Sequence, residues 1–69
     1  MTQKEMIMEH LKKYGNISTF EAFVDYGVTR LSGRIFELRH DGHDIKSDRR
    51  AMRNRFGKKI MYDVYTLEE

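Results

Sequence analysis

A chain of 69 residues with a net charge of +2 and no cysteine is one domain with a small core, and it holds neither disulfides nor a cysteine-based zinc site. No run approaches the roughly 20 apolar residues of a membrane span, and the first residues lack a signal-peptide stretch, so we expect a soluble protein of the reducing cytoplasm. Charged residues make up 35% of the chain, but apolar residues recur at ordered spacings, which favours a folded domain.

The first half of the chain predicts two helices joined by a short extended piece. Thr2 opens a capping-box pattern with the glutamate three residues later, and a helix over residues 3–14 follows. Its expected inward face consists of Ile7, Leu11 and Tyr14. Ser18 opens a second capping box ahead of a helix over residues 18–26. The apolar residues of this second helix are Phe20, Ala22, Phe23 and Val24.

A tight turn and a third helix come next. Gly27 can adopt the left-handed conformation that ends a helix, and Thr29 can cap the helix that follows, predicted over residues 29–41. Its core stripe consists of Leu31, Ile35 and Leu38. Two helices joined by a short turn that contains glycine match the helix-turn-helix motif, in which the second helix is offered to DNA.

After Gly42 the pattern changes to strands. Residues 43–47 and 60–67 are predicted to pair as an antiparallel hairpin, joined by a long mobile loop over residues 48–59. Residues 46–59 carry +6, which leaves −4 on the other 55 residues. The basic residues are Lys46, Arg49, Arg50, Arg53, Arg55, Lys58 and Lys59. A cationic hairpin after a helix-turn-helix is a wing, so the predicted fold is α+β: a winged helix-turn-helix with three helices and a C-terminal β-hairpin.

The sequence resembles a family of small winged helix-turn-helix domains common in bacteriophage and prophage proteins, over roughly residues 5–67. The motifs that carry the resemblance are Ser18-Thr19-Phe20-Glu21-Ala22, Tyr26-Gly27-Val28, Arg30-Leu31, Arg34-Ile35, Leu38-Arg39, Gly42-His43-x-Ile45, Gly57-Lys58 and Tyr65-Thr66-Leu67. This resemblance implies the winged fold and, through the fold, DNA binding. The wing here is longer and richer in arginine than the resemblance leads us to expect.

The third helix supplies candidate contacts to bases. They are Thr29, Arg30, Gly33, Arg34, Glu37 and His40, which lie away from the core stripe. For Arg34 and Glu37 the structural alternative is a surface ion pair, and for Arg39 we favour a packing role. Gly33 has two explanations of equal weight, which are close approach to DNA and a tight crossing with the second helix.

The wing supplies candidate contacts to the DNA backbone. Arginine side chains are attracted both to phosphates and to narrow minor grooves, whereas lysines are expected to contact phosphates only. The arginines are Arg49, Arg50, Arg53 and Arg55, and the lysines are Lys58 and Lys59. The structural alternative is a solvated charged loop, but the acids that normally neutralise such a loop are nearly absent.

Other kinds of site find little support in the sequence. We expect no enzyme and no cofactor, because no nucleophile with a base, paired acids or phosphate-binding glycine loop is present. We expect no metal, because the three histidines, His10, His40 and His43, are too few and too scattered. In the last strand, Ile60, Tyr62 and Val64 face outward if Met61, Tyr65 and Leu67 face inward with Asp63 near the rim, and either of the two registers exposes apolar side chains. Such a stripe marks a homodimer or protein-partner surface unless the long loop covers it.

The leading functional prediction is a double-stranded DNA-binding protein. It would be a phage-type transcriptional regulator or an excisionase-like accessory factor in the cytoplasm of a bacterial host, with no membrane role. The alternative is a small protein-binding adaptor or inhibitor of a host complex. RNA binding ranks third, because the aromatic residues are expected mostly in the core.

Overall fold

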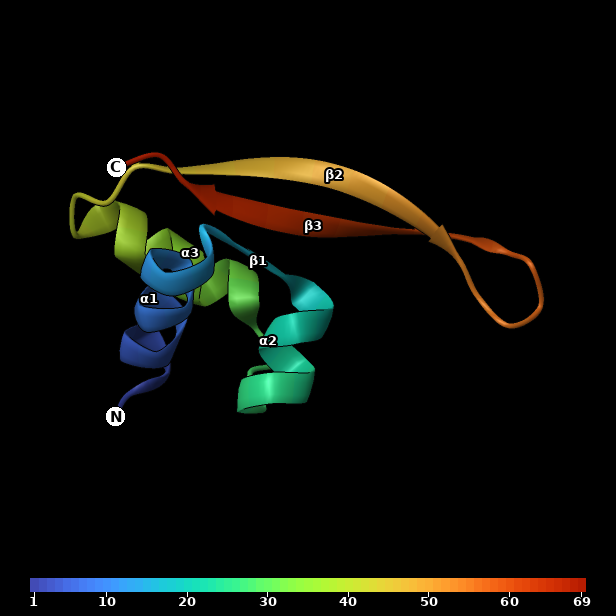
Figure 1. The fold of residues 1–69 in the computed structure, drawn as a ribbon, viewed down its shortest axis with the longest axis horizontal. Helices are drawn as coiled ribbons and strands as arrows, with labels where there is room; N and C mark the ends of the chain where they lie inside the picture. The colour runs from blue at the N-terminus through green and yellow to red at the C-terminus, as the bar shows by residue number, and fades with distance from the viewer.

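The computed structural model describes residues 1–69 as three helices and a three-stranded antiparallel sheet. The elements are α1 (Gln3–Tyr14), β1 (Asn16–Ser18), α2 (Thr19–Tyr26), α3 (Leu31–His40), β2 (Ile45–Arg53) and β3 (Lys59–Leu67). Figure 1 shows the hairpin of β2 and β3 passing over the three helices and projecting beyond them, so that its tip is far from the rest of the chain. The molecule is elongated, with principal extents of 39, 22 and 20 Å.

Helices α1 and α2 begin at the two capping boxes expected from the sequence. Thr2 Oγ1 accepts a hydrogen bond from Glu5 N, while the Glu5 carboxylate accepts one from Thr2 N at 2.7 Å. Ser18 and Glu21 form the same reciprocal pair. Gly27, with φ +67°, adopts the left-handed conformation and ends α2. These bonds satisfy N–H groups that the first turn of a helix leaves without partners.

The start of α3 differs from the sequence-based prediction. The helix begins at Leu31, its cap residue is Arg30, and no side chain makes a capping hydrogen bond. The prediction that Thr29 caps this helix was therefore wrong, because Thr29 lies one position before the cap residue and only the cap residue aims its side chain at the first-turn N–H groups. The first turn of α3 also contains no acid.

The last strand of the chain lies in the centre of the sheet, whose strand order is β1-β3-β2. Residues 16–18 of β1 pair with residues 64–66 of β3, while β2 pairs with the whole of β3, from Ile45 opposite Leu67 to Arg53 opposite Lys59. The prediction of a long loop over residues 48–59 was wrong, because the hairpin ladder continues to Arg53 and leaves only residues 54–58 as the tip. All but the first residue of β2 is exposed, so this strand lacks the alternation of buried apolar residues that indicates a strand in a sequence.

The core lies between the three helices and the base of the sheet. It contains Ile7, Met8, Leu11, Ile17, Ala22, Val28, Leu31, Ile35, Leu38, Ile45 and Tyr65. The expected stripe of α3 is fully included, whereas Tyr14 is 60% exposed, so its predicted inward position was wrong. Helix α2 contributes only Ala22 to this core. Because α2 is short and lies at the side of the fold, most of its apolar residues have no second layer to cover them (Figure 1).

All four phenylalanines of the chain are exposed. Phe20 is 44% exposed, Phe23 58%, Phe36 70% and Phe56 92%. Tyr65 is the only phenylalanine or tyrosine in the buried core. The expectation that the aromatic residues fall mostly at core positions was therefore wrong, and the reason is that the core is built from short aliphatic side chains that fill the narrow space between the small elements.

Candidate nucleic-acid interface

The outer part of the hairpin is a free arm, which we define as residues 49–63. Pairing between β3 and β1 ends at Val64, so the strands of the arm pair only with each other. The arm carries six basic residues and one acid, or +5, which leaves −3 on the rest of a chain whose net charge is +2. Its basic side chains are exposed on a projecting ribbon (Figure 1), so the positive field of the arm meets little opposing charge.

The basic residues of the arm differ in how they are held. Arg49 Nε lies 3.2 Å from Asp63 Oδ1 on the facing strand, an exposed ion pair that the sequence analysis did not foresee. Arg53 Nη1 donates to the carbonyl oxygen of Gly57 at 2.8 Å. The side chains that form no hydrogen bond or ion pair within the chain are those of Arg50, Arg55, Lys58 and Lys59. These four are free to contact phosphates.

The tip of the arm is an ordered turn. Asn54 Oδ1 accepts hydrogen bonds from the backbone N–H groups of Phe56 and Lys58, both at 2.9 Å. The backbone of Asn54 bonds to Lys58 and to Gly57 at the same distance. Gly57 has φ +79°, a left-handed conformation that glycine adopts without strain. Several bonds thus fix the backbone that carries the side chains of Arg55 and Phe56.

Helix α3 presents a second exposed surface. Its residues opposite the core stripe include Ser32, Phe36 and His40, all exposed, together with Gly33. Sequence analysis missed Ser32 and Phe36. The signal was available, because each residue turns by about 100° around a helix, so position 36 lies well off the stripe that contains Ile35. An exposed phenylalanine on a helix of this kind can contact the methyl group of thymine in the major groove.

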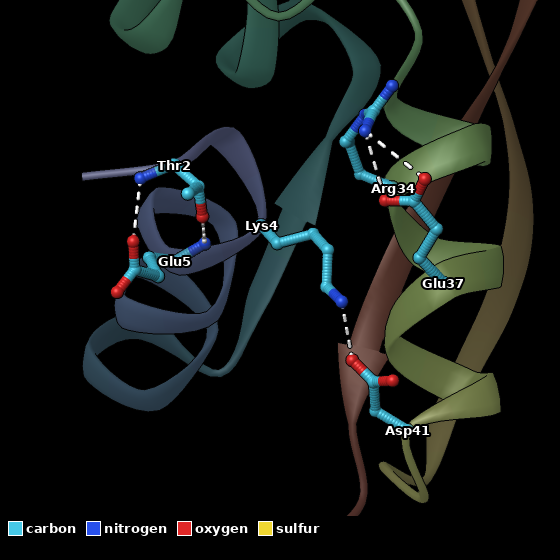
Figure 2. Close-up of polar contacts among 6 residues, drawn as sticks. All are labelled: Thr2, Lys4, Glu5, Arg34, Glu37 and Asp41. Atoms are coloured by element: carbon cyan, nitrogen blue, oxygen red, sulfur yellow. Dashed lines mark hydrogen bonds and ion pairs between the residues drawn. The ribbon is translucent and has the colours of Figure 1, made fainter.

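Arg34 and Glu37 form an ion pair with each other, which is the structural role that the sequence analysis gave as the alternative to base contacts. Arg34 Nη1 lies 3.0 Å from Glu37 Oε1, and Arg34 Nε is buried without a hydrogen-bond partner. Figure 2 shows this pair on the flank of α3 near Lys4, which reaches across from α1 to Asp41 at 2.6 Å. The hydrogen bond between Lys4 and Asp41 raises the pKa of the ammonium group and lowers the pKa of the carboxyl group. The pair of Lys4 and Asp41 ties the end of α3 to α1, while the pair of Arg34 and Glu37 lies within α3.

Gly33 has open space around it. A Cβ atom built at this position meets no heavy atom within 4 Å. A tight crossing with α2, one of the two explanations offered for this glycine, is therefore wrong. Because mid-helix glycine costs about 1 kcal/mol relative to alanine, close approach of a partner is the explanation that remains.

The N-terminus of α3 adds a favourable environment for an anion. It has no capping side chain and no acid in its first turn, unlike α1 and α2. The positive end of the helix dipole and the N–H groups of Leu31 and Ser32 are therefore left open, whereas Gly33 N donates to the carbonyl oxygen of Arg30 at 3.1 Å. The side chains of Thr29 and Arg30 beside them are exposed. A DNA phosphate matches this arrangement in charge and in hydrogen bonding.

Other polar residues singled out in the sequence have structural contacts. Arg39 Nε donates to the carbonyl oxygen of Ile45 at 2.9 Å, and this bond fixes the start of β2, which is the packing role favoured for it. His10 is buried, with Nδ1 2.6 Å from Tyr26 Oη, and it joins α1 to α2. His43 pairs with Glu69 at 3.0 Å. No group of three or more His, Cys, Asp or Glu side chains is placed to hold a metal ion.

The outward face predicted for the last strand is largely covered. Val64 is only 6% exposed, and Tyr62 is half-buried with its ring 5.0 Å from that of Phe20. Only Ile60 is exposed, at 36%. The expected outward placement of Tyr62 and Val64 was therefore wrong. The cover comes from α2 and not from the long loop that we expected to supply it, because β1 ends at Ser18 and Phe20 then reaches over the edge of β3.

A three-helix domain with a two-stranded wing is the architecture of winged helix-turn-helix proteins, a DNA-binding class. A family model described as winged helix-turn-helix domain matches residues 2–69. The chain belongs to that family, and the α+β winged fold expected from the sequence is confirmed. Neither the curated proteins nor the solved structures contain a match. None of the helices is both long enough and apolar enough to cross a lipid bilayer.

Proposed function

We propose that this protein binds double-stranded DNA as a transcriptional regulator or an excisionase-like accessory factor of a phage. Helix α3 enters the major groove and reads base edges, while the arm follows the phosphates toward the neighbouring minor groove. The resemblance to phage and prophage domains supports the finer role, and membership of the winged helix-turn-helix family supports DNA binding itself.

One observation carries the proposal, namely the separation of charge between the arm and the body. The arm holds +5 on an exposed ribbon, and the rest of the chain holds −3. Such a charged strip matches a partner with dense negative charge, and duplex DNA supplies one phosphate per about 1.7 Å of its axis. Within the arm, the predicted phosphate contacts are the six residues Arg49, Arg50, Arg53, Arg55, Lys58 and Lys59.

The test is fluorescence anisotropy with random duplex DNA across a salt series. If four to six phosphates are neutralised, log affinity falls with log salt at a slope of about −4 to −5. Replacing Arg49, Arg50, Arg53 and Arg55 by alanine is expected to abolish binding at moderate salt. Absence of binding by the wild-type protein at low salt would overturn the proposal.

A matched pair of variants separates the arm from net charge. Arg50→Ala with Arg55→Ala removes two free cations from the arm, and Lys12→Ala with Lys13→Ala removes two from the end of α1. Both pairs change the net charge equally. We expect the arm pair to reduce the magnitude of the salt slope by about 2 and the α1 pair to leave it nearly unchanged. Equal losses in both pairs would mean that binding responds to net charge alone.

A protein-binding function has one observation in its favour. A hollow of about 310 Å³ between α2 and the turn that follows it is lined by Thr19, Phe20, Phe23, Val28 and Thr29. If this hollow binds a protein, Phe23→Ser would abolish partner binding or self-association, measured by sedimentation. The variants of the arm would leave that association unchanged. We rank this function second because the hollow leaves the charge of the arm unexplained.

A further inference from the structure

We propose that Phe56 is an apolar wedge at the tip of the arm, which enters the minor groove, separates two stacked base pairs and so bends the DNA. The inference rests on the proposed DNA binding and adds an activity to it, the deformation of the duplex. It would make the protein an architectural factor as well as a binder.

The first observation is the placement of Phe56. It is 92% exposed, the most exposed large apolar side chain in the chain, and it belongs to the turn of residues 54–58 that closes the hairpin. The end of this hairpin projects beyond the helices (Figure 1). Nothing in the fold requires a phenylalanine there, because the side chain is not part of the core. A single exposed apolar residue is common on protein surfaces, so placement alone does not indicate a function.

The second observation is that the tip is built to hold this residue in place. Asn54 Oδ1 accepts from Phe56 N and from Lys58 N, and Arg53 Nη1 braces the turn by donating to the carbonyl oxygen of Gly57. The exposed aromatic side chain is thus carried on a fixed backbone rather than on a loose loop. An intercalating side chain needs such order, because ordering it only on binding would cost conformational entropy.

The third observation is that the surroundings of Phe56 are cationic. Arg55 precedes it and Lys58 follows two positions later, so residues that phosphates attract flank it in the sequence. The strands of the arm are about 4.8 Å apart before side chains are added, while the minor groove of B-DNA is about 6 Å wide. The ribbon therefore does not fit an undistorted groove. Only the tip can enter, and insertion of a phenylalanine widens the groove and kinks the duplex toward the major groove.

The free length of the arm can be compared with the distance between neighbouring grooves of DNA. Residues 49–53 of β2 extend about 17 Å beyond the last residues that pair through β1, at about 3.4 Å per residue. Half a turn of DNA, which separates a major groove from the adjoining minor groove, is also about 17 Å. The free length of the arm therefore matches the spacing between neighbouring grooves.

The competing partner for Phe56 is the hollow on α2 of a second copy. The acids of α2, the helix that supplies most of the lining of that hollow, are Glu21 and Asp25, which are fewer than the cations of the arm. Duplex DNA offers both continuous negative charge and an apolar space between bases, so it matches the tip better. Flexible pyrimidine–purine steps are the expected points of insertion.

The experiment uses the full chain and a duplex of about 30 base pairs rich in TA steps, with 2-aminopurine at a central step and a dye pair at the ends. Unstacking raises the 2-aminopurine fluorescence, and bending shortens the distance between the dyes. We expect wild-type protein to raise the fluorescence at least about twofold and to increase energy transfer, with Phe56→Leu retaining both effects because leucine also serves as a wedge.

Three variants decide the outcome. Phe56→Ala should remove both signals while weakening binding less than about tenfold, and it should remain folded because the side chain touches nothing in the core. Asn54→Ala should diminish both signals by loosening the tip, and Phe23→Ala should change neither. Binding of duplex DNA by the wild-type protein without unstacking or bending would overturn the role of Phe56 as a wedge and leave DNA binding intact. Tighter binding to single-stranded DNA than to the duplex would overturn the wedge in the same way. So would a defect of Phe56→Ala that is seen only in self-association. Failure of the proposed DNA binding itself would be seen separately, as no binding of duplex DNA by the wild-type protein in the anisotropy experiment.

Discussion

Gly33 is a residue of low helix propensity in the middle of a helix. It lies in the middle of α3, where glycine is unfavourable, and the space around a Cβ atom is empty. We expect Gly33→Ala to stabilise the fold by up to about 1 kcal/mol, seen as a higher midpoint of thermal unfolding. DNA affinity should fall on the order of tenfold, because the methyl group would stand between the helix and the groove. If affinity is unchanged while stability rises, α3 does not approach DNA at this position.

Phe36 offers a test of base recognition. Burying one methyl group is worth about 0.8 kcal/mol, or about fourfold in affinity. On a selected target site, replacing the contacted thymine by deoxyuridine should weaken wild-type binding by roughly that factor and should have no effect on Phe36→Ala. This comparison forms a double-mutant cycle, measured by anisotropy. Equal sensitivity of both proteins to the missing methyl group would place Phe36 outside the base-reading surface.

The burial of side chains could be predicted from the sequence where apolar residues repeat at helical spacing, and it could not be predicted elsewhere. The stripe of Leu31, Ile35 and Leu38 recurs at helical spacing, so its burial was visible in the sequence. The exposure of Phe23 was not visible, because apolar residues are normally expected inward and nothing in the local sequence tells how thinly the fold covers a short helix. The ion pair of Arg49 with Asp63 depends on strand register, which the sequence left open between two alternatives.

At the scale of elements, the helix caps set most of the local order. Ser18→Ala removes the side-chain acceptor at the start of α2 and is expected to destabilise the fold by about 1 kcal/mol. For a domain of this size the midpoint of thermal unfolding should fall by about 4–8 °C. The matched control is Ser32→Ala on α3, where no side-chain capping bond exists, and its midpoint should change little. Equal shifts would show that the capping box contributes nothing beyond helix propensity.

Element boundaries followed the sequence closely for the helices and poorly for the wing. Both capping boxes and Gly27 mark their helix ends through local hydrogen bonds, so the first two helices lie within a residue of their expected bounds. Most of β2 has no buried face, and its polar residues 46–53 are held in a strand only by pairing with β3. Pairing between distant segments leaves no mark in the local sequence, which is why a strand was mistaken for a loop.

At the scale of the whole molecule, carboxylates fix the acid stability of the fold. Hydrogen bonds from backbone N–H groups lower the pKa of Glu5 and of Glu69, and Lys4 lowers that of Asp41. Lowered folded-state pKa values mean that the stabilisation is present above the ordinary values of 4.5 and 3.8 and is lost as the pH falls through the folded-state values. We therefore expect the thermal midpoint to be level near neutral pH and to fall below about pH 4.5.

The variant Glu5→Gln isolates one part of this dependence. Glutamine can keep the reciprocal hydrogen bonds of the capping box but carries no charge to titrate. Its midpoint should lie below that of the wild-type protein at pH 7 and approach it at low pH, measured by circular dichroism. A difference between the two proteins that stays constant across the acid range would contradict the assigned role of Glu5.

The uneven charge of the chain makes the molecule an electric dipole, with the arm as its positive end. If the protein binds DNA as proposed, the field of the duplex should turn this dipole before contact, so that the tip arrives first and the helices dock afterwards. Cations on the arm should then act mainly on the association rate, and contacts of α3 mainly on the lifetime of the complex. Stopped-flow mixing at low salt should show slower association for Arg50→Ala with Arg55→Ala and faster dissociation for Phe36→Ala. The arm would thus set the orientation and rate of association, and helix α3 would set the rate of dissociation.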